Sequence, residues 1–362
     1  MRQFSRQPEP RRVLQTMKKI YLLLAAAIIA LGATAEDSIS RCRKTYGVAF
    51  YNLENLFDTI NSNGRWDLEF SPAGKRQWDS EKYNIKVNNL ANAIANMVTD
   101  ATPGGPAIVG IAEVENASVV QDLVDAAPLR NRRLQFVHHD SPDLRGIDVG
   151  LLYDPEQYEV LSVRNHRLVL TDNPDFLTRD QMCVTGLLDG DSLSVIINHW
   201  PSRLGGQEES EPMRVAAALL TRHIADSLLA LNPRQGIIIM GDLNDDPQNR
   251  SVAEVVGARA DEKDVKCGAG FYNPWWRILE NGKGTLTYRG AWNLFDQILL
   301  SGALLEDGDS GLRYAGAEIM DIEFLKQTEE KYRGMPWRTY AGGRFLGGYS
   351  DHFPTQVFLI KR

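Results

Sequence analysis

Short apolar segments rich in isoleucine, valine and leucine recur along the chain, and polar side chains follow each of them closely. The segments are residues 48–53, 107–114, 148–153, 193–198, 236–240 and 294–300. Runs of this length and composition are typical of buried β-strands. We therefore expect sheets whose strands end at a polar, functional edge.

Helical patterns lie between the expected strands. Residues 81–98 carry apolar side chains at helical spacing, which predicts a helix with one buried stripe. Residues 212–231 show the same spacing, with Pro212 in a first-turn position that tolerates proline. After Thr285 the chain is mostly strand and turn. This order predicts an α/β (α+β) fold in which two packed sheets are flanked by helices.

The N-terminal segment has the pattern of a leader. Met17 opens a stretch with two lysines, an apolar run and small residues up to Ala35, as in a secretory signal peptide. We predict that residues 1–35 are an untranslated or signal-peptide segment, with the signal at 17–35, and that 36–362 form one domain. The protein would then be secreted or periplasmic. The alternative is an uncleaved N-terminal anchor.

The charge of the chain limits its partners. Cleavage after Ala35 would remove six basic residues and one acidic residue, so the formal net charge of −7 would become −12. A protein this acidic has no general attraction for polyanions. A nucleic-acid substrate would therefore have to be held by local arginine or lysine side chains and by bound metal.

The most specific motif is Gly241-Asp242-Leu243-Asn244, which directly follows the apolar run 237–240. Strand alternation would point Asp242 and Asn244 the same way into one pocket. A carboxylate and an amide at such a place can activate water and hold a phosphoryl oxygen. The alternative is an ordinary turn, because aspartate and asparagine favour turns and helix caps.

A second motif, Ser350-Asp351-His352, places a carboxylate beside an imidazole. Histidine titrates near neutrality and can act as a general acid when a carboxylate fixes its tautomer. Asp296 lies in an otherwise apolar strand, where a charge is costly unless it is paired or bound to metal. Asp296 is thus the candidate partner of His352. The alternative is that His352 is a structural residue.

Glu113 and Asn52 also follow apolar runs. Carboxylate and amide oxygens are ligands that Mg²⁺ accepts, and we expect Glu113 to bind metal. We interpret the neighbouring Glu115 as a solvated acid or a helix-start residue.

The run 193–198 ends in Asn198-His199, and Arg203 follows a few residues later. Arginine suits a phosphate through bidentate hydrogen bonds, although a surface ion pair is an equal alternative for Arg203. Arg145 precedes the run 148–153 and is a further candidate for contact with substrate.

These motifs occur in the chain order of the endonuclease/exonuclease/phosphatase superfamily, which contains DNase I-like nucleases and several phosphatases. The matching residues are Asn52, Glu113, Asn198-His199, Gly241-Asp242-x-Asn244, Asp296 and Ser350-Asp351-His352. The chain resembles this superfamily from about residue 46 to residue 360. The loop after His199 resembles that of exported bacterial nuclease-like members. One departure is Ala112, where the family usually has a glutamine before the metal-binding glutamate.

The resemblance implies a four-layered α/β sandwich, with two mainly antiparallel sheets and one catalytic domain. It also implies roles for individual residues. Mg²⁺ or Mn²⁺ would be bound by Asn52, Glu113 and Asp351. Catalysis would use Asp242 and Asn244 to position water and phosphate, with His199, His352 and Asp296 for charge stabilisation and proton transfer. Substrate would be contacted by Asn198, Arg203 and Arg145.

The resemblance predicts an exported metal-dependent phosphoesterase, foremost a nuclease-like phosphodiesterase with DNA or RNA as candidate substrates. Alternatives are a phosphatase, a phospholipid or sphingomyelin phosphodiesterase, and a noncatalytic binding protein on the same scaffold. We expect a monomer without a stable protein partner. The expected loops 60–80, 201–212 and 264–284 would decide the substrate. The pair Trp275-Trp276 in the last loop could contact a membrane, but we expect it to pack internally.

Overall fold

In residues 44–60, 69–306 and 311–361, which the computed structural model describes, two β-sheets pack face to face. One sheet has, in spatial order, β14 (Leu312–Ile319), β17 (Thr355–Lys361), β1 (Lys44–Leu56), β2 (Ile108–Val114), β4 (Asp148–Tyr153) and β3 (Gln135–His138). The other has β5 (Tyr158–His166), β6 (Gln181–Leu188), β7 (Asp191–His199), β8 (Gly236–Asp242), β13 (Asp296–Ser301), β10 (Phe271–Tyr272) and β9 (Ala258–Arg259). Both sheets are mixed: β1 and β2, β7 and β8, and β9 and β10 run parallel, whereas most other neighbours are antiparallel.

Two small hairpins complete the strands. They are formed by β11 (Leu286–Tyr288) with β12 (Ala291–Asn293), and by β15 (Tyr340–Ala341) with β16 (Arg344–Phe345). The α-helices are α2 (Ser80–Ala95), α3 (Ala117–Asp125), α4 (Gln207–Leu231) and α5 (Trp275–Glu280).

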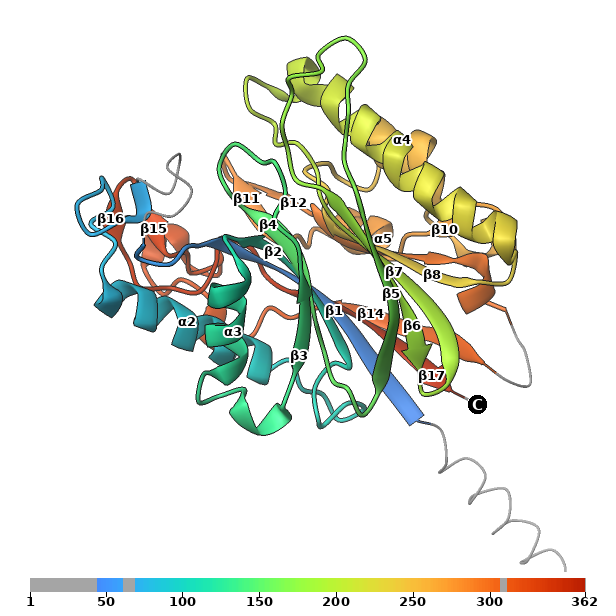
Figure 1. Cartoon of the computed structure of the whole chain (residues 1–362), viewed down its shortest axis with the longest axis horizontal. Helices are drawn as coiled ribbons and strands as arrows, with labels where there is room; N and C mark the ends of the chain where they lie inside the picture. The colour runs from blue at the N-terminus through green and yellow to red at the C-terminus, as the bar shows by residue number, and fades with distance from the viewer. Residues whose placement is uncertain (1–43, 61–68, 307–310, 362) are drawn as a thin grey trace, which may run out of the picture. The chain divides into compact units, whose positions relative to one another are not determined.

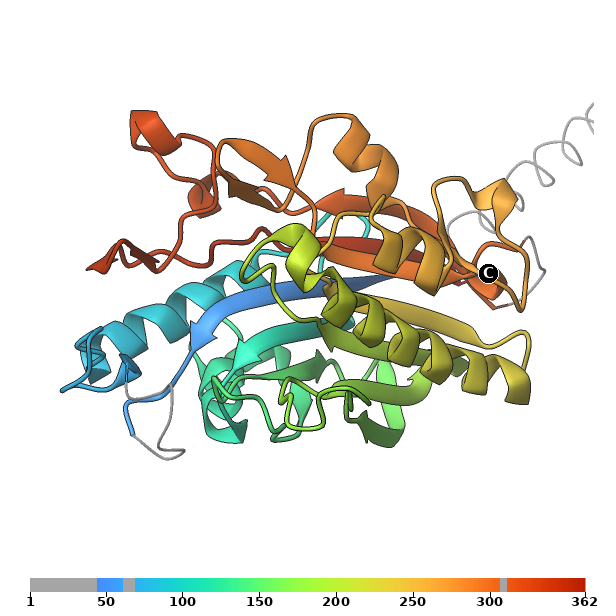
Figure 2. The same ribbon diagram turned by 90° about the horizontal axis from the view of Figure 1, so that it is seen from above.

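The side chains of β8 show how the layers arise. Ile238 and Met240 belong to the core between the two sheets, whereas Ile237 and Ile239 belong to the core under α4. This alternation is the period of two that a strand imposes on its side chains. The other sheet packs its outer face in the same way on α2 and α3, and Figures 1 and 2 show the helices on the outer sides of the sheets. The predicted four-layered sandwich is confirmed.

The helix predicted at 81–98 is α2, but the helix predicted at 212–231 begins earlier than expected. It starts at Gln207, so Pro212 lies inside the helix rather than in its first turn. Glu208 and Glu209 occupy the first turn instead, where negative charge interacts favourably with the helix dipole. The expected loop 201–212 is correspondingly shorter.

The segment 264–284 is not the plain loop that we predicted, because it contains β10 and α5. Trp275 is fully buried, and its indole Nε1 donates a hydrogen bond to the Ile298 carbonyl at 2.9 Å. The expectation that the pair packs internally is therefore confirmed for Trp275, whereas Trp276 is half-buried.

The described residues from Thr45 to Lys361 form one compact unit. Within the described ranges, no helix is long and apolar enough to cross a bilayer. The predicted signal peptide at 17–35 lies outside the described residues.

Gly241 is expected to be essential for the junction of β7 and β8. Its φ is +155°, and an added Cβ would lie 2.2 Å from the Asn198 carbonyl oxygen. Gly241→Ala should therefore lower the free energy of unfolding by roughly 1–3 kcal/mol or more, as overpacked sites do. Gly104→Ala is the control, because its Cβ would meet nothing within 4 Å. Equal stability of the two variants in urea unfolding would show that this account of the junction is wrong.

Candidate active site

The ends of several strands meet at one end of the sandwich. Asp242, the last residue of β8, pairs with His199 at the end of the parallel strand β7 and with Asp296 at the start of the antiparallel strand β13. Asn52 of β1, in the other sheet, donates a hydrogen bond from Nδ2 to Asp242 Oδ2 at 3.0 Å. Four predicted site residues from both sheets are therefore brought together.

His352 lies between two carboxylates. Asp242 and Asp296 are directly opposite each other, an arrangement of like charges that is unfavourable in a sheet. His352 Nδ1 is 2.7 Å from Asp296 Oδ2, and His352 Nε2 is 3.9 Å from Asp242 Oδ2. Thr285 also donates to Asp296 Oδ2, at 2.5 Å. The imidazole thus supplies the positive charge that this pair of carboxylates requires.

The charged neighbours of His352 determine its protonation. Burial alone would lower the pKa of His352, but the charge of Asp296 and its hydrogen bond, followed by the charges of Asp351 and Asp242, raise that pKa well above its usual value. A protonated imidazole carries an N–H on each nitrogen, so the ring that donates a hydrogen bond from Nδ1 to Asp296 still has a second N–H at Nε2. His352 can therefore donate a proton on the side that faces Asp242.

Asp242 is held by two donors in addition to its charged neighbours. Its Oδ1 accepts the backbone N–H of Asn244 at 3.0 Å, and its Oδ2 accepts Asn52 Nδ2. Burial raises the pKa of Asp242 to about 6, because the opposing effect of His352 is partly offset by Asp296. A carboxylate with this pKa is mostly ionised at neutral pH and can accept a proton readily.

Asn244 is close to the site, but not for the reason that we predicted. Strand β8 ends at Asp242, and Asn244 has a left-handed φ of +50°, so strand alternation does not continue to it. Its side-chain amide donates to the Trp200 carbonyl at 3.0 Å. The expectation that strand alternation carries through to Asn244 is wrong, because the strand ends at Asp242. Asn244 contacts Asp242 through its backbone N–H.

A β-bulge turns Glu113 towards the site. The pairing of β2 with β4 shifts register between Ala112 and Val114, and Glu113 has a φ of +64°. Bulges re-aim side chains near functional sites. The Glu113 carboxylate accepts the Asn55 N–H at 2.9 Å and pairs with Arg145 at 3.2 Å.

The charge of Glu113 is stabilised by its neighbours. Burial would raise the pKa of Glu113, but the charge of Arg145 and its hydrogen bond to the carboxylate outweigh burial and lower this pKa to about 2. The carboxylate is therefore ionised at any physiological pH.

His199 differs from His352 in its protonation. Burial, followed by the charge of Arg179, lowers the pKa of His199 well below its usual value, so the ring is neutral. Its Nε2 is 3.6 Å from Asp242 Oδ2 and 3.8 Å from Glu113 Oε1. Its Nδ1 is buried and has no hydrogen-bond partner among the described residues. The two histidines therefore offer one neutral and one charged imidazole.

The profile of the endonuclease/exonuclease/phosphatase family matches residues 47–361. The chain belongs to this family. Among solved structures, a humanized TDP2 of D. rerio has a TM-score of 0.54 at 15% identity, over 87% of this chain and 98% of that chain. A mannosyl-6-phosphatase of Bacteroides thetaiotaomicron has a TM-score of 0.51 at 17% identity, over 87% and 99%.

An endonuclease/exonuclease/phosphatase family protein of Bacteroides thetaiotaomicron is similar to the same degree, with a TM-score of 0.51 at 16% identity, over 88% of this chain and 98% of that chain. At these identities the likeness shows the fold alone. No curated protein matches the sequence.

Enzymes of the endonuclease/exonuclease/phosphatase family depend on divalent metal, and two groups of side chains bear on where a cation fits. Ligand atoms of Asp242, Asp296 and His352 lie within 4.8 Å of one another. However, the 2.7 Å contact between Asp296 and His352 is a hydrogen bond, and its proton excludes a cation shared by the two. We therefore favour the oxygen atoms around Glu113 as the place for metal.

The donor chemistry around Glu113 fits Mg²⁺ or Mn²⁺. Glu113 is ionised, Asn52 Oδ1 accepts the Glu54 N–H at 2.9 Å, and Asp351 Oδ1 lies 3.8 Å from His352 Nε2. Hard oxygen donors of this kind suit such cations.

A buried charge network beside Asp351 was not predicted. Glu54, which has a φ of +49° in the irregular end of β1, accepts the Thr339 N–H at 2.6 Å and lies 3.9 Å from Lys86 Nζ. Arg338 donates a short hydrogen bond to Asp351 and lies 3.8 Å from Glu54. One feature of the sequence indicates this network: Lys86 is a lysine on the apolar, buried face of α2, where it needs polar partners.

Asn198 does not lie in the site, although we predicted that it contacts substrate. Its neighbour His199 points between the sheets, so alternation turns Asn198 to the outer face of β7. There Nδ2 donates to the Ile196 and Met240 carbonyls, and Oδ1 accepts hydrogen bonds from Trp200 Nε1 and Thr221 Oγ1 at 3.1 and 3.0 Å. The side chain is fully buried. Asn198 is thus a structural residue.

The Arg203 guanidinium, which we predicted to contact substrate, instead makes hydrogen bonds and ion pairs within the protein. It donates to the Asn244 carbonyl at 2.9 Å and pairs with Asp245 and Asp246, at 3.1 and 3.3 Å. It also lies over the Phe295 ring at 4.4 Å. Arg203 therefore braces the turn that follows β8. Arg145, in contrast, reaches the site through its pair with Glu113.

We expect Asn198→Ala to act on stability rather than on substrate binding. The variant leaves buried partners without hydrogen bonds, which costs about 1–3 kcal/mol for each unsatisfied group. Urea unfolding should show the loss, while KM for a phosphoester stays within about twofold of wild type. An unchanged free energy of unfolding combined with a raised KM would instead restore Asn198 as a substrate contact.

Proposed function

We propose that this protein hydrolyses phosphoesters and that the reaction depends on Mg²⁺ or Mn²⁺. The family consists of hydrolases that act on phosphoester bonds. The observation that carries the proposal for this chain is the hydrogen bond from His352 to Asp296, with Asp242 on the opposite side of the imidazole. This arrangement places a proton donor and a proton acceptor beside each other in a buried site.

The proposed step is an in-line attack of water on phosphorus. The water oxygen bonds to phosphorus while the bond to the leaving oxygen breaks. One water proton passes to the Asp242 carboxylate, whose pKa of about 6 suits a general base. His352 gives its Nε2 proton to the leaving oxygen, and Asp296 keeps the ring oriented throughout. The neutral His199 donates a hydrogen bond to a phosphoryl oxygen.

Glu113, Asn52 and Asp351 would hold the divalent cation, which supplies positive charge for the phosphoryl oxygens when it is bound. Arg145 pairs with Glu113 at 3.2 Å, so we expect its guanidinium to move towards substrate or to remain as a second cation beside the same carboxylate. Either position keeps positive charge next to the phosphate.

Metal should stabilise the folded protein. A cation that binds only the folded state at about 100 times its dissociation constant adds roughly 2.7 kcal/mol to the free energy of unfolding. We expect this increase in urea unfolding with Mg²⁺ compared with EDTA. A noncatalytic binding protein on the same scaffold has no need of this site, so identical unfolding curves would favour that alternative.

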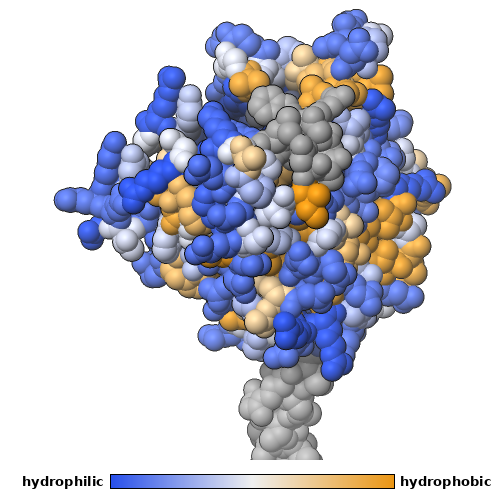
Figure 3. All heavy atoms as spheres, turned by 60° about the vertical axis from the view of Figure 1, so that its left-hand side comes forward, coloured by the Kyte–Doolittle hydropathy of each residue, from blue (hydrophilic) through white to orange (hydrophobic). Residues whose placement is uncertain are grey.

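We propose that the substrate is DNA or RNA and that the protein is a nuclease-like phosphodiesterase. We propose that it acts outside the cytoplasm as a monomer. After removal of the predicted signal peptide the chain is acidic, so nucleic acid would have to be held by local basic side chains and metal rather than by the overall charge of the protein. A second candidate is a phosphatase for compact sugar phosphates, and it is favoured by a cavity of about 480 Å³ beside Asp351. The face that carries β15 and β16 is largely hydrophilic, with hydrophobic residues in separate patches (Figure 3), which does not favour a lipid surface there.

The substrate class can be tested with a panel of DNA, RNA, a sugar phosphate and sphingomyelin, each with Mg²⁺ and with EDTA. Cleavage of nucleic acid would support the nuclease-like function, and release of phosphate from the sugar phosphate alone would support the phosphatase. Metal-dependent cleavage of sphingomyelin alone would contradict both.

A further inference from the structure

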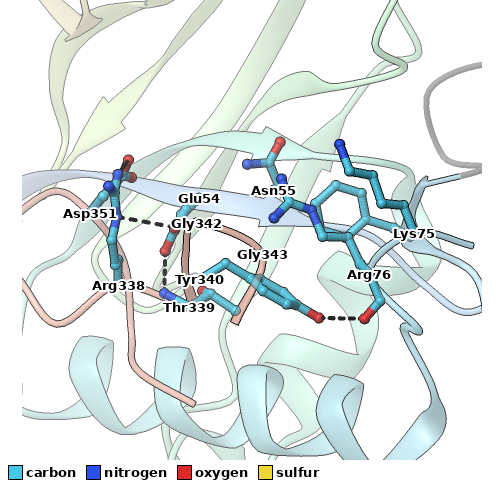
Figure 4. Close-up of a pocket in the computed structure, with 11 residues that line it drawn as sticks. Glu54, Asn55, Lys75, Arg76, Arg338, Thr339, Tyr340, Gly342, Gly343 and Asp351 are labelled. Carbon is cyan, nitrogen blue, oxygen red and sulfur yellow. Dashed lines mark hydrogen bonds and ion pairs between the residues drawn. The ribbon is translucent and has the colours of Figure 1, made fainter. Parts of the chain in front are cut away.

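A cavity of about 480 Å³ lies directly beside the proposed site and shares residues with it. Asp351 and Glu54 form its inner wall, and Asn55, whose backbone holds Glu113, lies at its edge. The outer walls come from the segments 70–76 and 338–343, which are far apart in the sequence (Figure 4). The volume is in the range of sites that take small molecules.

The cations of this cavity are not equally available. Arg338 is already neutralised, because it donates to Asp351 and lies 3.8 Å from Glu54. Arg76 has one carboxylate nearby, Glu69, whose Oε1 is 3.5 Å from Nε, and its Nε has no hydrogen-bond partner among the described residues. Lys75 is 81% exposed and lies 3.7 Å from the same Glu69 oxygen. Two cations therefore share one carboxylate.

Arg76 is held in place by contacts with two aromatic side chains. Its guanidinium lies over the Tyr340 ring at 4.9 Å and over the Phe70 ring at 5.8 Å. The Tyr340 hydroxyl donates to the Arg76 carbonyl at 3.1 Å, which fixes the backbone as well. Figure 4 shows the guanidinium directed from the side of Lys75 towards the middle of the cavity. An arginine that stacks on aromatic rings keeps its planar edge for bidentate hydrogen bonds.

The rest of the cavity leaves room for a polar group. Gly342 and Gly343 form part of the wall, and a Cβ added to either would meet nothing within 4 Å. Phe70 and Tyr340 are each only 9% exposed, so their faces are covered and do not offer a stacking platform for a base. The available chemistry is that of an anion site.

We propose that this cavity binds a second phosphate of the substrate, with Arg76 as its main ligand and Lys75 as a supporting cation. The inference rests on the proposed function, since the first phosphate would occupy the site around Asp242 and His352. The second phosphate has two sources: the neighbouring phosphate of a nucleic-acid strand, or the second phosphate of a sugar bisphosphate.

The test compares paired substrates in the full chain with Mg²⁺. One pair is the dinucleotide dTpdT and its 5′-phosphorylated form, and the other is glucose 6-phosphate and glucose 1,6-bisphosphate. Wild type should prefer the two-phosphate member of at least one pair, and Arg76→Ala should lower its kcat/KM by about 10- to 100-fold, as expected for lost hydrogen bonds to a charged group. The one-phosphate member should change less than about twofold. The pair that responds identifies the source.

Two further variants separate binding from folding. Arg76→Lys keeps a cation and an aliphatic stem over Tyr340, and it should restore part of the preference. Arg277→Ala is the matched control, because Arg277 is an exposed arginine that pairs with Asp261 and Glu280. If Arg76→Ala is folded and lowers kcat/KM equally for both members of every pair, the proposal is overturned.

A binding measurement distinguishes failure of this inference from failure of the proposed function. We would titrate inorganic pyrophosphate into wild type, Arg76→Ala and Arg277→Ala in EDTA by calorimetry. Arg76→Ala should raise the dissociation constant about 10-fold or more, and Arg277→Ala should leave it unchanged. If Arg76→Ala weakens pyrophosphate binding but wild type hydrolyses none of the substrates, the anion site is supported and the proposed phosphoesterase function is contradicted. Equal pyrophosphate binding by all three proteins would contradict the anion site.

Discussion

Replacing His352 by alanine is expected to lower kcat for phosphoester hydrolysis by about 10²- to 10⁴-fold, the usual contribution of a positioned general acid. The physical reason is the 2.7 Å hydrogen bond to Asp296, which orients the ring, and the raised pKa of His352, which keeps a proton on Nε2. Steady-state rates with a saturating phosphoester and Mg²⁺ measure the effect.

The matched control is His223→Ala, because His223 is exposed on α4. The His352 variant should still gain stability from Mg²⁺, since it retains Glu113 and Asp351. An activity within about threefold of wild type, from a folded variant, would show that His352 is a structural residue, which is the alternative that the sequence left open.

Replacing Glu113 by glutamine is expected to lower kcat/KM by about 10³-fold, which corresponds to roughly 4 kcal/mol of transition-state stabilisation. Glutamine keeps the size of the side chain and can still accept the Asn55 N–H, but it removes the charge that attracts a divalent cation. The variant should also lose most of the stabilisation by Mg²⁺ in urea unfolding, which separates it from the His352 variant.

Glu115→Gln is the control for Glu113. Glu115 is not the solvated acid of our first alternative, because it is 6% exposed and its Oε2 accepts the Asp58 N–H at 2.8 Å, but it does lie at a helix start, directly before Asn116, the N-cap of α3. Glutamine can keep that hydrogen bond, so rate and metal response should change little. If Glu113→Gln retains the Mg²⁺ response of wild type, the assignment of the cation to Glu113 is wrong.

The sequence predicted the layers well because they depend on local periodicity. The alternation of Ile237, Ile238, Ile239 and Met240 determines which side chains enter each core, and the apolar stripe of α2 determines which face it buries. Asp296 was also predicted correctly as the partner of His352, since a charge in an apolar strand needs a partner.

The sequence did not predict the positions of site residues that depend on backbone irregularity or on contacts between distant segments. Glu113 reaches the site through a bulge and a positive φ, and no pattern of apolar residues encodes either. Arg203 looked like a phosphate ligand because its partners Asp245 and Asp246 come from a turn more than 40 positions away. The exclusion of Asn198, in contrast, followed from alternation with His199 and could have been predicted.

The cavity beside Asp351 could not be predicted from the sequence, because it also depends on contacts between distant segments. Glu54, Arg76 and Arg338 meet only because the irregular end of β1 and the segments before α2 and around β15 fold together. Their separation in the sequence gives no spacing to recognise. Lys86 alone carried a signal, as a lysine in the buried stripe of a helix that must be satisfied by partners such as Thr339 and Tyr349.

The most direct test of the central claim is the rate of bis-p-nitrophenyl phosphate hydrolysis by the purified protein with Mg²⁺ or Mn²⁺, with EDTA, and with the Glu113→Gln and His352→Ala variants in metal. We predict hydrolysis that requires metal and falls by at least about 100-fold in both variants. Hydrolysis that persists in EDTA, or that is equal in wild type and both folded variants, would contradict the account.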